Sequence, residues 1–191
     1  MVGLIQKILF AMIKDIKGEE GVKKLKQLAR IPLDKSFQMN LVYSDEEWQR
    51  LYAAAHELLQ LNEEEVVTAY ADYFGKDAIQ RFPTWFQMSN NSYEFLSIQP
   101  VIHNCFATSN ADASTRQAIN DKFRVEKSPK KLITHYRSPN KLCSLYKALA
   151  NWVINYYHDE AQIEEKKCLK LGDDECEIHV QWTKLRNWHA L

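Results

Sequence analysis

The sequence predicts an α+β fold, in which a helical N-terminal half is followed by a small antiparallel sheet with one intervening helix, in the order β-β-α-β-β. Two observations predict it. The first half of the 191 residues places apolar side chains at helical spacing behind N-capping residues. The second half, from about residue 118, changes to short strand-like runs that end at turn signals. A chain of this length supports one domain with a sizeable core.

The first helical segment is amphipathic. Residues 2–17 carry one broad apolar stripe at helical spacing, formed by Ile5, Ile8, Leu9, Met12, Ile13 and Ile16. Residues 19–30 indicate a second helix, which is short and charged. The stretch 31–43 has no hydrophobic period, so we expect a loop there.

Two helices follow, and each is marked by its N-cap. Ser44 precedes acidic first-turn residues and begins a helix over residues 44–61. Asn62 begins the next helix, over residues 62–82, with Glu65 at the capping-box position. Both starts are therefore defined by local side-chain chemistry.

A further helical stretch covers residues 91–109 and contains Pro100 and His103. Because proline removes a backbone donor, we expect a bend near the histidine. The neighbours of His103 one turn away are mostly apolar, namely Leu96, Pro100, Phe106 and Ala107. The favoured interpretation of a lone histidine on such a face is a partly buried side chain with one hydrogen bond. The alternative is an axial ligand to a heme iron, which needs a neutral imidazole in an apolar slot.

The second half supplies the sheet. We expect two strands, then a helix, then a hairpin around the turn sequence GDDE, over residues 118–128, 130–138, 140–160, 162–171 and 176–182. No repeat or low-complexity tract interrupts this order.

Composition excludes several classes of protein. Lys plus Arg equals Asp plus Glu, 25 each, whereas a nucleic-acid binder should show a basic excess. The apolar N-terminus lacks the basic leader and cleavage site of a signal peptide, and no run approaches the roughly 20 apolar residues of a membrane span. We therefore expect a soluble, cytoplasmic protein without membrane insertion. In that compartment the four cysteines are expected to be thiols or metal ligands.

Two hydroxyl side chains meet where a predicted strand ends. Tyr136 and Ser138 are two residues apart and face the same way, while Arg137 faces the other. Pro139 then ends the strand. Adjacent hydroxyls suit an acceptor such as a carboxylate, and the alternative is a polar sheet edge. Without a partner motif, the sheet edge is favoured.

The order of these features resembles the heme-nitric oxide/oxygen binding (H-NOX) family, in its stand-alone bacterial type. The features are the opening MVGLI, similar to a Met-x-Gly start, the helical VIHNCF, the strand end YRSP and the helix start KLC. The resemblance covers nearly the whole chain and implies heme b between the two halves. It implies His103 as the proximal iron ligand and Tyr136 and Ser138 as hydrogen-bond donors to the heme propionates.

Asn140 departs from the family signature Tyr-x-Ser-x-Arg, because it stands where the family has arginine. Arginine forms a charge-assisted pair with a propionate, whereas an amide donates without charge. We expect anchoring that is weaker by roughly 1.5–3 kcal/mol, with the heme retained. Lys141 and Lys147 are the nearby cations that could replace the charge.

The same resemblance implies which gas is bound. Members that bind O₂ place a distal tyrosine nine residues after the motif tyrosine, and here that position is Leu145. The expected distal pocket is apolar and is lined by Ile5, Leu9, Leu145 and Leu149. Without a hydrogen-bond donor, bound O₂ is not stabilised, whereas NO needs none. A sensor of NO that excludes O₂ follows, unless Tyr70 or Tyr73 reaches the iron.

The family implies a mechanical signal. NO binds ferrous heme opposite His103 and breaks the iron–histidine bond, and the helix carrying His103 then shifts. The implied partner is a separate histidine kinase or cyclic-di-GMP enzyme. No glycine-rich nucleotide loop, paired carboxylates or nucleophile motif stands out, so we do not expect an enzyme.

The remaining cysteines form a second candidate site. Cys168 and Cys176 flank the GDDE hairpin turn, and Cys143 begins the preceding helix. Buried thiols are the plain interpretation. A subset of the family holds a structural zinc with three cysteines and one histidine, and Glu165 stands at the histidine position. His179 falls on the other face of its strand. Zinc binding and thiol redox switching both remain open.

Three hypotheses follow for one domain over residues 1–182, with a helical subdomain over about 1–60, a heme-holding subdomain over about 61–182, and a tail over 183–191. The first, favoured, is a heme-based NO sensor. The second is a heme-independent redox or zinc switch on the same scaffold. The third is an adaptor that has lost heme together with the arginine.

Overall fold

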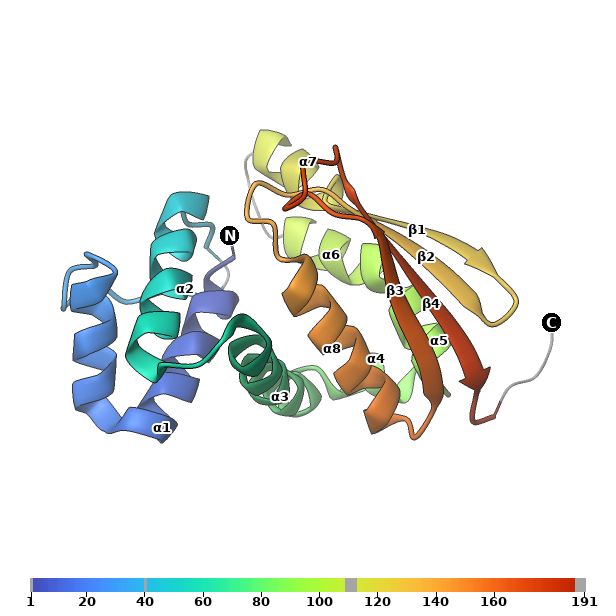
Figure 1. Cartoon of the computed structure of the whole chain (residues 1–191), viewed down its shortest axis with the longest axis horizontal. Helices are drawn as coiled ribbons and strands as arrows, with labels where there is room; N and C mark the ends of the chain where they lie inside the picture. Colours follow the sequence, from blue (N-terminus) through green and yellow to red (C-terminus); the bar gives the residue numbers. More distant parts are fainter. Residues whose placement is uncertain (1, 40, 109–112, 188–191) are drawn as a thin grey trace. The chain divides into compact units, whose positions relative to one another are not determined.

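The structure is a computed structural model and describes residues 2–39, 41–108 and 113–187 (Figure 1). Its elements, in chain order, are α1 (Gly3–Leu28), α2 (Asp45–Leu59), α3 (Glu63–Arg81), α4 (Pro83–Gln87), α5 (Ser92–Ser97), α6 (Gln99–Thr108), α7 (Ala113–Asn120), β1 (Phe123–Ser128), β2 (Lys131–Tyr136), α8 (Cys143–Tyr156), β3 (Glu160–Lys167) and β4 (Cys176–Lys184). The chain divides into two compact units, Met1–Phe74 and Gly75–Leu191. The boundary falls within α3, later than the subdomain boundary expected near residue 60.

The first unit consists of α1, α2 and the first part of α3. The two helices expected over 2–17 and 19–30 are joined in α1, which is interrupted at Gly18 with φ 70° and ψ −171°. Glycine adopts this left-handed φ without the clash of a Cβ atom, so the interruption is placed by the residue type. α1 packs against α2, and the core there includes Leu9, Met12 and Trp48.

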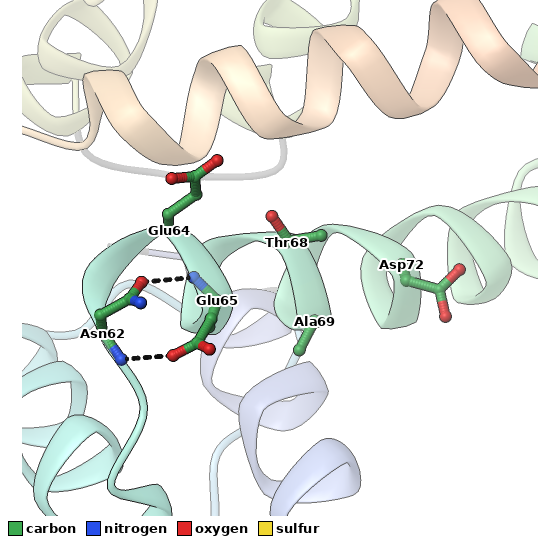
Figure 2. Close-up of a pocket in the computed structure, with 6 residues that line it drawn as sticks. All are labelled: Asn62, Glu64, Glu65, Thr68, Ala69 and Asp72. Atoms are coloured by element: carbon green, nitrogen blue, oxygen red, sulfur yellow. Dashed lines mark hydrogen bonds between the residues drawn. The ribbon is translucent and has the colours of Figure 1, made fainter.

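Both predicted N-caps are confirmed. The Ser44 hydroxyl accepts a hydrogen bond from the Glu47 amide at 3.1 Å. At the start of α3, the Asn62 side chain accepts from the Glu65 amide at 3.0 Å, and the Glu65 carboxylate accepts from the Asn62 amide at 2.8 Å (Figure 2). This reciprocal pair is a capping box and satisfies two backbone donors of the first turn.

The helices of the second unit differ in two places from the expectation. The stretch 91–109 is split at Ile98, and Pro100 is the second residue of α6, where a missing backbone donor costs nothing. Pro100 therefore helps to start the helix that carries His103 and does not bend it further along. The strand expected from residue 118 was wrong at its start, because α7 occupies Ala113–Asn120. Its end is supported by a hydrogen bond from Gln117 to Asp121 at 2.8 Å, four residues apart.

The four strands form one antiparallel sheet in the order β1-β2-β4-β3, which confirms the predicted α+β fold. β4 runs to Lys184, two residues into the expected tail. Helices α5, α6 and α8 lie along one face of this sheet (Figure 1). The core side chains from the strands point toward these helices and include Leu132, Tyr136, Cys176, Ile178 and Val180.

Among the described residues, no helix combines the length and the apolar character that crossing a bilayer requires.

Candidate functional site

His103 lies on α6 and faces the start of the sheet. Its imidazole lies against the ring of Phe123, with centroids 4.4 Å apart. The side chain is half-buried, and enough protein surrounds it that burial lowers its pKa from 6.5 to about 4, with the charge of Lys122 acting in the same direction. The imidazole is therefore neutral at pH 7 and keeps a nitrogen lone pair that can ligate a metal.

Phe123 connects this histidine to the expected propionate motif. Its ring lies 5.0 Å from Tyr136 and 5.5 Å from Tyr146, centroid to centroid. Sequence reasoning missed this residue, because a phenylalanine at the start of a strand has no local feature that marks it. The contact depends on how α6 packs on β1, which the structure supplies.

Tyr136 and Ser138 are both buried at the junction of β2 and α8. The Tyr136 hydroxyl accepts a hydrogen bond from the backbone N–H of Leu142 at 3.2 Å. The Ser138 hydroxyl accepts one from the backbone N–H of Asn140 at 3.3 Å. Burial raises the pKa of Tyr136 to about 12, against the opposing effect of its hydrogen bond with Ser138. Each of the two hydroxyls also carries a hydrogen that it can donate. This donor set fits a carboxylate.

The face assignments around this motif are confirmed. Arg137 is exposed, and its guanidinium lies 3.6 Å from the Asp174 carboxylate, on the side of the strand opposite the hydroxyls. Asn140 is buried beside Ser138. Lys147, considered as a replacement charge, instead donates to the Glu165 carboxylate at 2.7 Å. The positive charge of Lys147 therefore lies beside Glu165 and the cysteines.

The expected distal residues lie on different elements. Leu145 and Leu149 are one turn apart on α8, on a different face from Tyr146, which belongs to the core under the sheet. The Tyr146 hydroxyl lies 2.6 Å from the Thr134 hydroxyl, and burial raises its pKa to about 12. Tyr146 is therefore part of the core under the sheet.

The other two pocket residues, Ile5 and Leu9, belong to α1 in the first unit. In the same unit the Tyr70 hydroxyl donates to the Ile5 carbonyl at 2.8 Å. That bond occupies the hydrogen that a distal tyrosine would offer to O₂. A joint pocket of Ile5, Leu9, Leu145 and Leu149 stays a prediction.

The cysteine region forms a compact group of potential ligands. One ligand atom from each of Cys143, Glu165, Cys168 and Cys176 lies within 4.8 Å of all the others. We call these four residues the Cys–Glu cluster. The Cys143 and Cys168 sulfurs are 3.6 Å apart, and all three thiols are buried. Burial raises the pKa of Cys143 and of Cys176, so without a metal these groups stay protonated at pH 7.

Glu165 completes this group from β3. Burial disfavours its charge, but the hydrogen bond from Lys147 and the nearby thiols of Cys168 and Cys143 outweigh it and lower the pKa of Glu165. The carboxylate is therefore ionised at pH 7. His179 lies on the other face of β4, with its Nε2 atom 2.7 Å from Glu177, as its offset from Cys176 indicated.

A shallow surface depression lies on α3 and contains the capping box (Figure 2). Half of its lining residues are acidic, and the lining consists of Asn62, Glu64, Glu65, Thr68, Ala69 and Asp72. None of the predicted site residues lines it, and the bonds drawn in Figure 2 serve to begin the helix.

The matches to known proteins extend over almost the entire chain. The sequence profile of the haem-NO-binding family matches residues 2–165. An H-NOX protein from S. oneidensis in the Fe(II)NO ligation state is similar, with a TM-score of 0.80, 17% identity, and coverage of 96% of this chain and 100% of that chain. No curated protein sequence matches the chain.

Two further solved structures show the same fold. An oxygen-binding H-NOX domain related to soluble guanylate cyclases has a TM-score of 0.77 at 16% identity, covering 100% of this chain and 99% of its own. An unliganded Fe(II) H-NOX mutant from K. algicida has a TM-score of 0.73 at 18% identity, and the match covers 96% of this chain and 97% of that chain. At these identities the solved structures establish the fold alone.

Proposed function

Because this chain belongs to the haem-NO-binding (H-NOX) family, a family of gas-binding heme sensors, we propose that it is a nitric oxide sensor with His103 as its iron ligand. One observation carries the proposal. The neutral imidazole of His103 and the ring of Tyr136 both pack against Phe123, and the hydroxyls of Tyr136 and Ser138 are able to donate to a carboxylate. The residues proposed as iron ligand and propionate donor therefore lie within the same unit.

Each residue has a separate task in this proposal. His103 would hold the iron from the proximal side, and Tyr136 and Ser138 would donate to the propionates. Asn140, buried beside them, would contribute its amide in place of a charged clamp. Heme, when bound, would supply an iron that can take up NO. Release of His103 would free α6, and a partner protein would read the movement of that helix.

The discrimination between gases rests on the absence of a donor at Leu145. Leucine offers no hydrogen bond, and the Tyr70 hydroxyl donates to Ile5. We therefore expect NO binding without stable O₂ binding. The partner would be a separate histidine kinase or cyclic-di-GMP enzyme, as the family resemblance suggests.

The test is the visible spectrum of the purified, reduced protein before and after NO, with O₂ as the control. A Soret band that shifts with NO and ignores O₂ supports the proposal. His103→Gly should lose the five-coordinate histidine spectrum, and added imidazole should restore it, because imidazole replaces the missing ligand. A colourless protein that does not take up added heme would refute the proposal.

The Cys–Glu cluster supports a second candidate function, a zinc site or thiol switch that acts independently of heme. Four potential ligands within 4.8 Å match the tetrahedral coordination that zinc prefers. As a switch, two thiols would reduce one peroxide to two waters and form a disulfide, most directly between Cys143 and Cys168. Measuring the zinc content of the purified protein distinguishes the zinc site from the thiol switch. Cys105→Ser is the control, because it leaves the cluster intact.

A further inference from the structure

The two carboxylate oxygens of Glu165 have different surroundings. Oε2 accepts a hydrogen bond from the Lys147 ammonium at 2.7 Å. Oε1 is buried near the Cys143 and Cys168 thiols, but no donor reaches it with hydrogen-bond geometry. A buried anionic oxygen without a donor is costly, so it points to a partner of positive charge. One carboxylate oxygen of Glu165 and the three sulfurs of the Cys–Glu cluster lie within 4.8 Å of one another, so a cation among them would meet four ligand atoms.

Lys147 reaches this carboxylate because of its position on α8. It lies one helical turn after Cys143, so both side chains lie on the same side of the helix. Glu165 and Cys168 come from the end of β3 and the turn after it. One turn of α8 and the end of β3 with its turn therefore supply three of the four ligands and the ammonium, and Cys176 of β4 is the fourth ligand.

The charge of the cluster explains why the lysine matters. Three thiolates and a carboxylate around a zinc ion leave an excess of two negative charges. A neutral histidine in place of Glu165 would leave an excess of one. With Glu165 as ligand, the positive charge of the Lys147 ammonium returns the net charge of the site to minus one. The Lys147 side chain is only partly exposed, so solvent screens this charge weakly.

We propose that Lys147 is a positioning residue for a zinc site in which Glu165 is the fourth ligand: the ammonium fixes Oε2 and leaves Oε1 for the metal. The Lys147–Glu165 pair then replaces a histidine. This inference rests on the zinc candidate above, and it predicts that Lys147 matters only while residue 165 is a carboxylate.

The experiment measures zinc affinity by competition with a chromophoric chelator in the full chain. It compares wild type, Lys147→Met, Glu165→His and the double variant. Lys147→Met should weaken zinc binding roughly tenfold or more with Glu165 present, and less than about twofold with histidine at 165. Lys147→Arg should restore most of the affinity, since it keeps the charge and the donor.

Lys166→Met is the matched control, because this lysine is exposed and pairs with Glu164 beside the cluster. It should leave zinc affinity unchanged. Cobalt substitution adds a readout of ligation, since the d–d absorption bands should differ between wild type and Glu165→His and should change in Lys147→Met. Circular dichroism of each variant shows that the fold is kept.

The outcomes separate the inference from the candidate it rests on. Equal weakening by Lys147→Met in both backgrounds, or none in either, overturns the role of Lys147 while zinc binding stands. If none of the four proteins binds zinc, the zinc candidate itself fails and the inference fails with it. If Lys147→Met does not fold, the Arg variant decides: affinity within about threefold of wild type supports the role, and a larger loss contradicts it.

Discussion

The ring of Phe123 lies against the imidazole of His103, with centroids 4.4 Å apart and planes tilted by 35°. The same ring lies 5.0 Å from Tyr136. The proposed iron ligand and a proposed propionate donor therefore share one packing neighbour. A displacement of α6 cannot occur without changing the packing at the start of β1, where this ring is anchored.

The lowered pKa of His103 predicts how stability depends on pH. Burial holds the folded-state pKa at about 4, below the ordinary 6.5 that the unfolded chain shows. The unfolded state then binds a proton that the native state does not, so the free energy of unfolding falls as pH drops from 6.5 toward 4. The loss should be at most about 3 kcal/mol. Urea unfolding of the heme-free protein at pH 7 and pH 4.5 measures it.

Two variants isolate this contribution. His103→Leu should lose less stability over the same pH interval than wild type does, because its side chain cannot titrate. Phe123→Ala should raise the pKa of His103 toward 6.5 by admitting water to the imidazole, which NMR titration can follow. An identical pH dependence in wild type and His103→Leu would contradict the assignment.

Asn140→Arg should slow heme loss. The substitution restores the charged donor of the family signature, and a charge-assisted hydrogen bond to a propionate is worth roughly 1.5–3 kcal/mol. Heme transfer to excess apomyoglobin should therefore become about tenfold slower or more. Arg137→Ala is the control, because that side chain is exposed on the other side of the strand and should leave the rate unchanged. An unchanged rate in Asn140→Arg would place the propionates elsewhere.

Leu145→Tyr should create O₂ binding. A hydroxyl at this position would donate to bound O₂, and a neutral hydrogen bond is worth roughly 1 kcal/mol, about fivefold in affinity. The visible spectrum in air should then show an oxygen complex that wild type lacks. Tyr146→Phe removes a hydroxyl that instead faces Thr134, so it should leave the gas response unchanged. Oxygen binding that responds to Tyr146 would show that the distal face is wrongly assigned.

The four cysteines should react at very different rates in metal-free protein. Cys105 is exposed, whereas the thiols of the Cys–Glu cluster are buried, and burial raises the pKa of Cys143 and Cys176. Thiolate is the reactive form, so one fast and three slow reactions with a disulfide reagent are expected at pH 8. Cys105→Ser should remove the fast phase. A fast phase that persists in this variant would show a reactive thiol in the cluster.

Local signals predicted much of the fold and of the cysteine region. Ser44 and Asn62 begin helices through contacts three residues away, which a sequence displays directly. The Cys–Glu cluster was also predictable in outline, since a hairpin turn brings Cys168 near Cys176. In each case the residues that meet are close in sequence or joined by one turn.

The contacts that sequence reasoning missed join elements that are distant along the chain. Phe123 meets His103 only because α6 packs on β1, and Lys147 meets Glu165 only because α8 packs on β3. Neither contact follows from hydrophobic period or turn chemistry. The prediction that a strand begins at residue 118 was wrong for a local reason. A short helix lies there, and the hydrogen bond from Gln117 to Asp121 supports its end.

Gly75→Ala should destabilise the protein although it lies inside α3. Alanine normally stabilises a helix interior by about 1 kcal/mol relative to glycine. Here an added Cβ would lie 2.3 Å from the Trp152 indole, which stacks on Tyr156 with ring centroids 5.6 Å apart and cannot move freely. Overpacking of this kind costs roughly 1–3 kcal/mol, so the free energy of unfolding should fall by about 1 kcal/mol.

The double variant with Trp152→Leu tests the cause. With the indole removed, the clash is relieved, and Gly75→Ala should become neutral or stabilising in that background. Urea unfolding of the four proteins measures this non-additivity directly. If Gly75→Ala is as stable as wild type with Trp152 present, the indole does not lie over the Gly75 backbone. The contact between α3 and α8 at this point would then have to be reassigned, because no other feature of Gly75 requires a residue without a side chain.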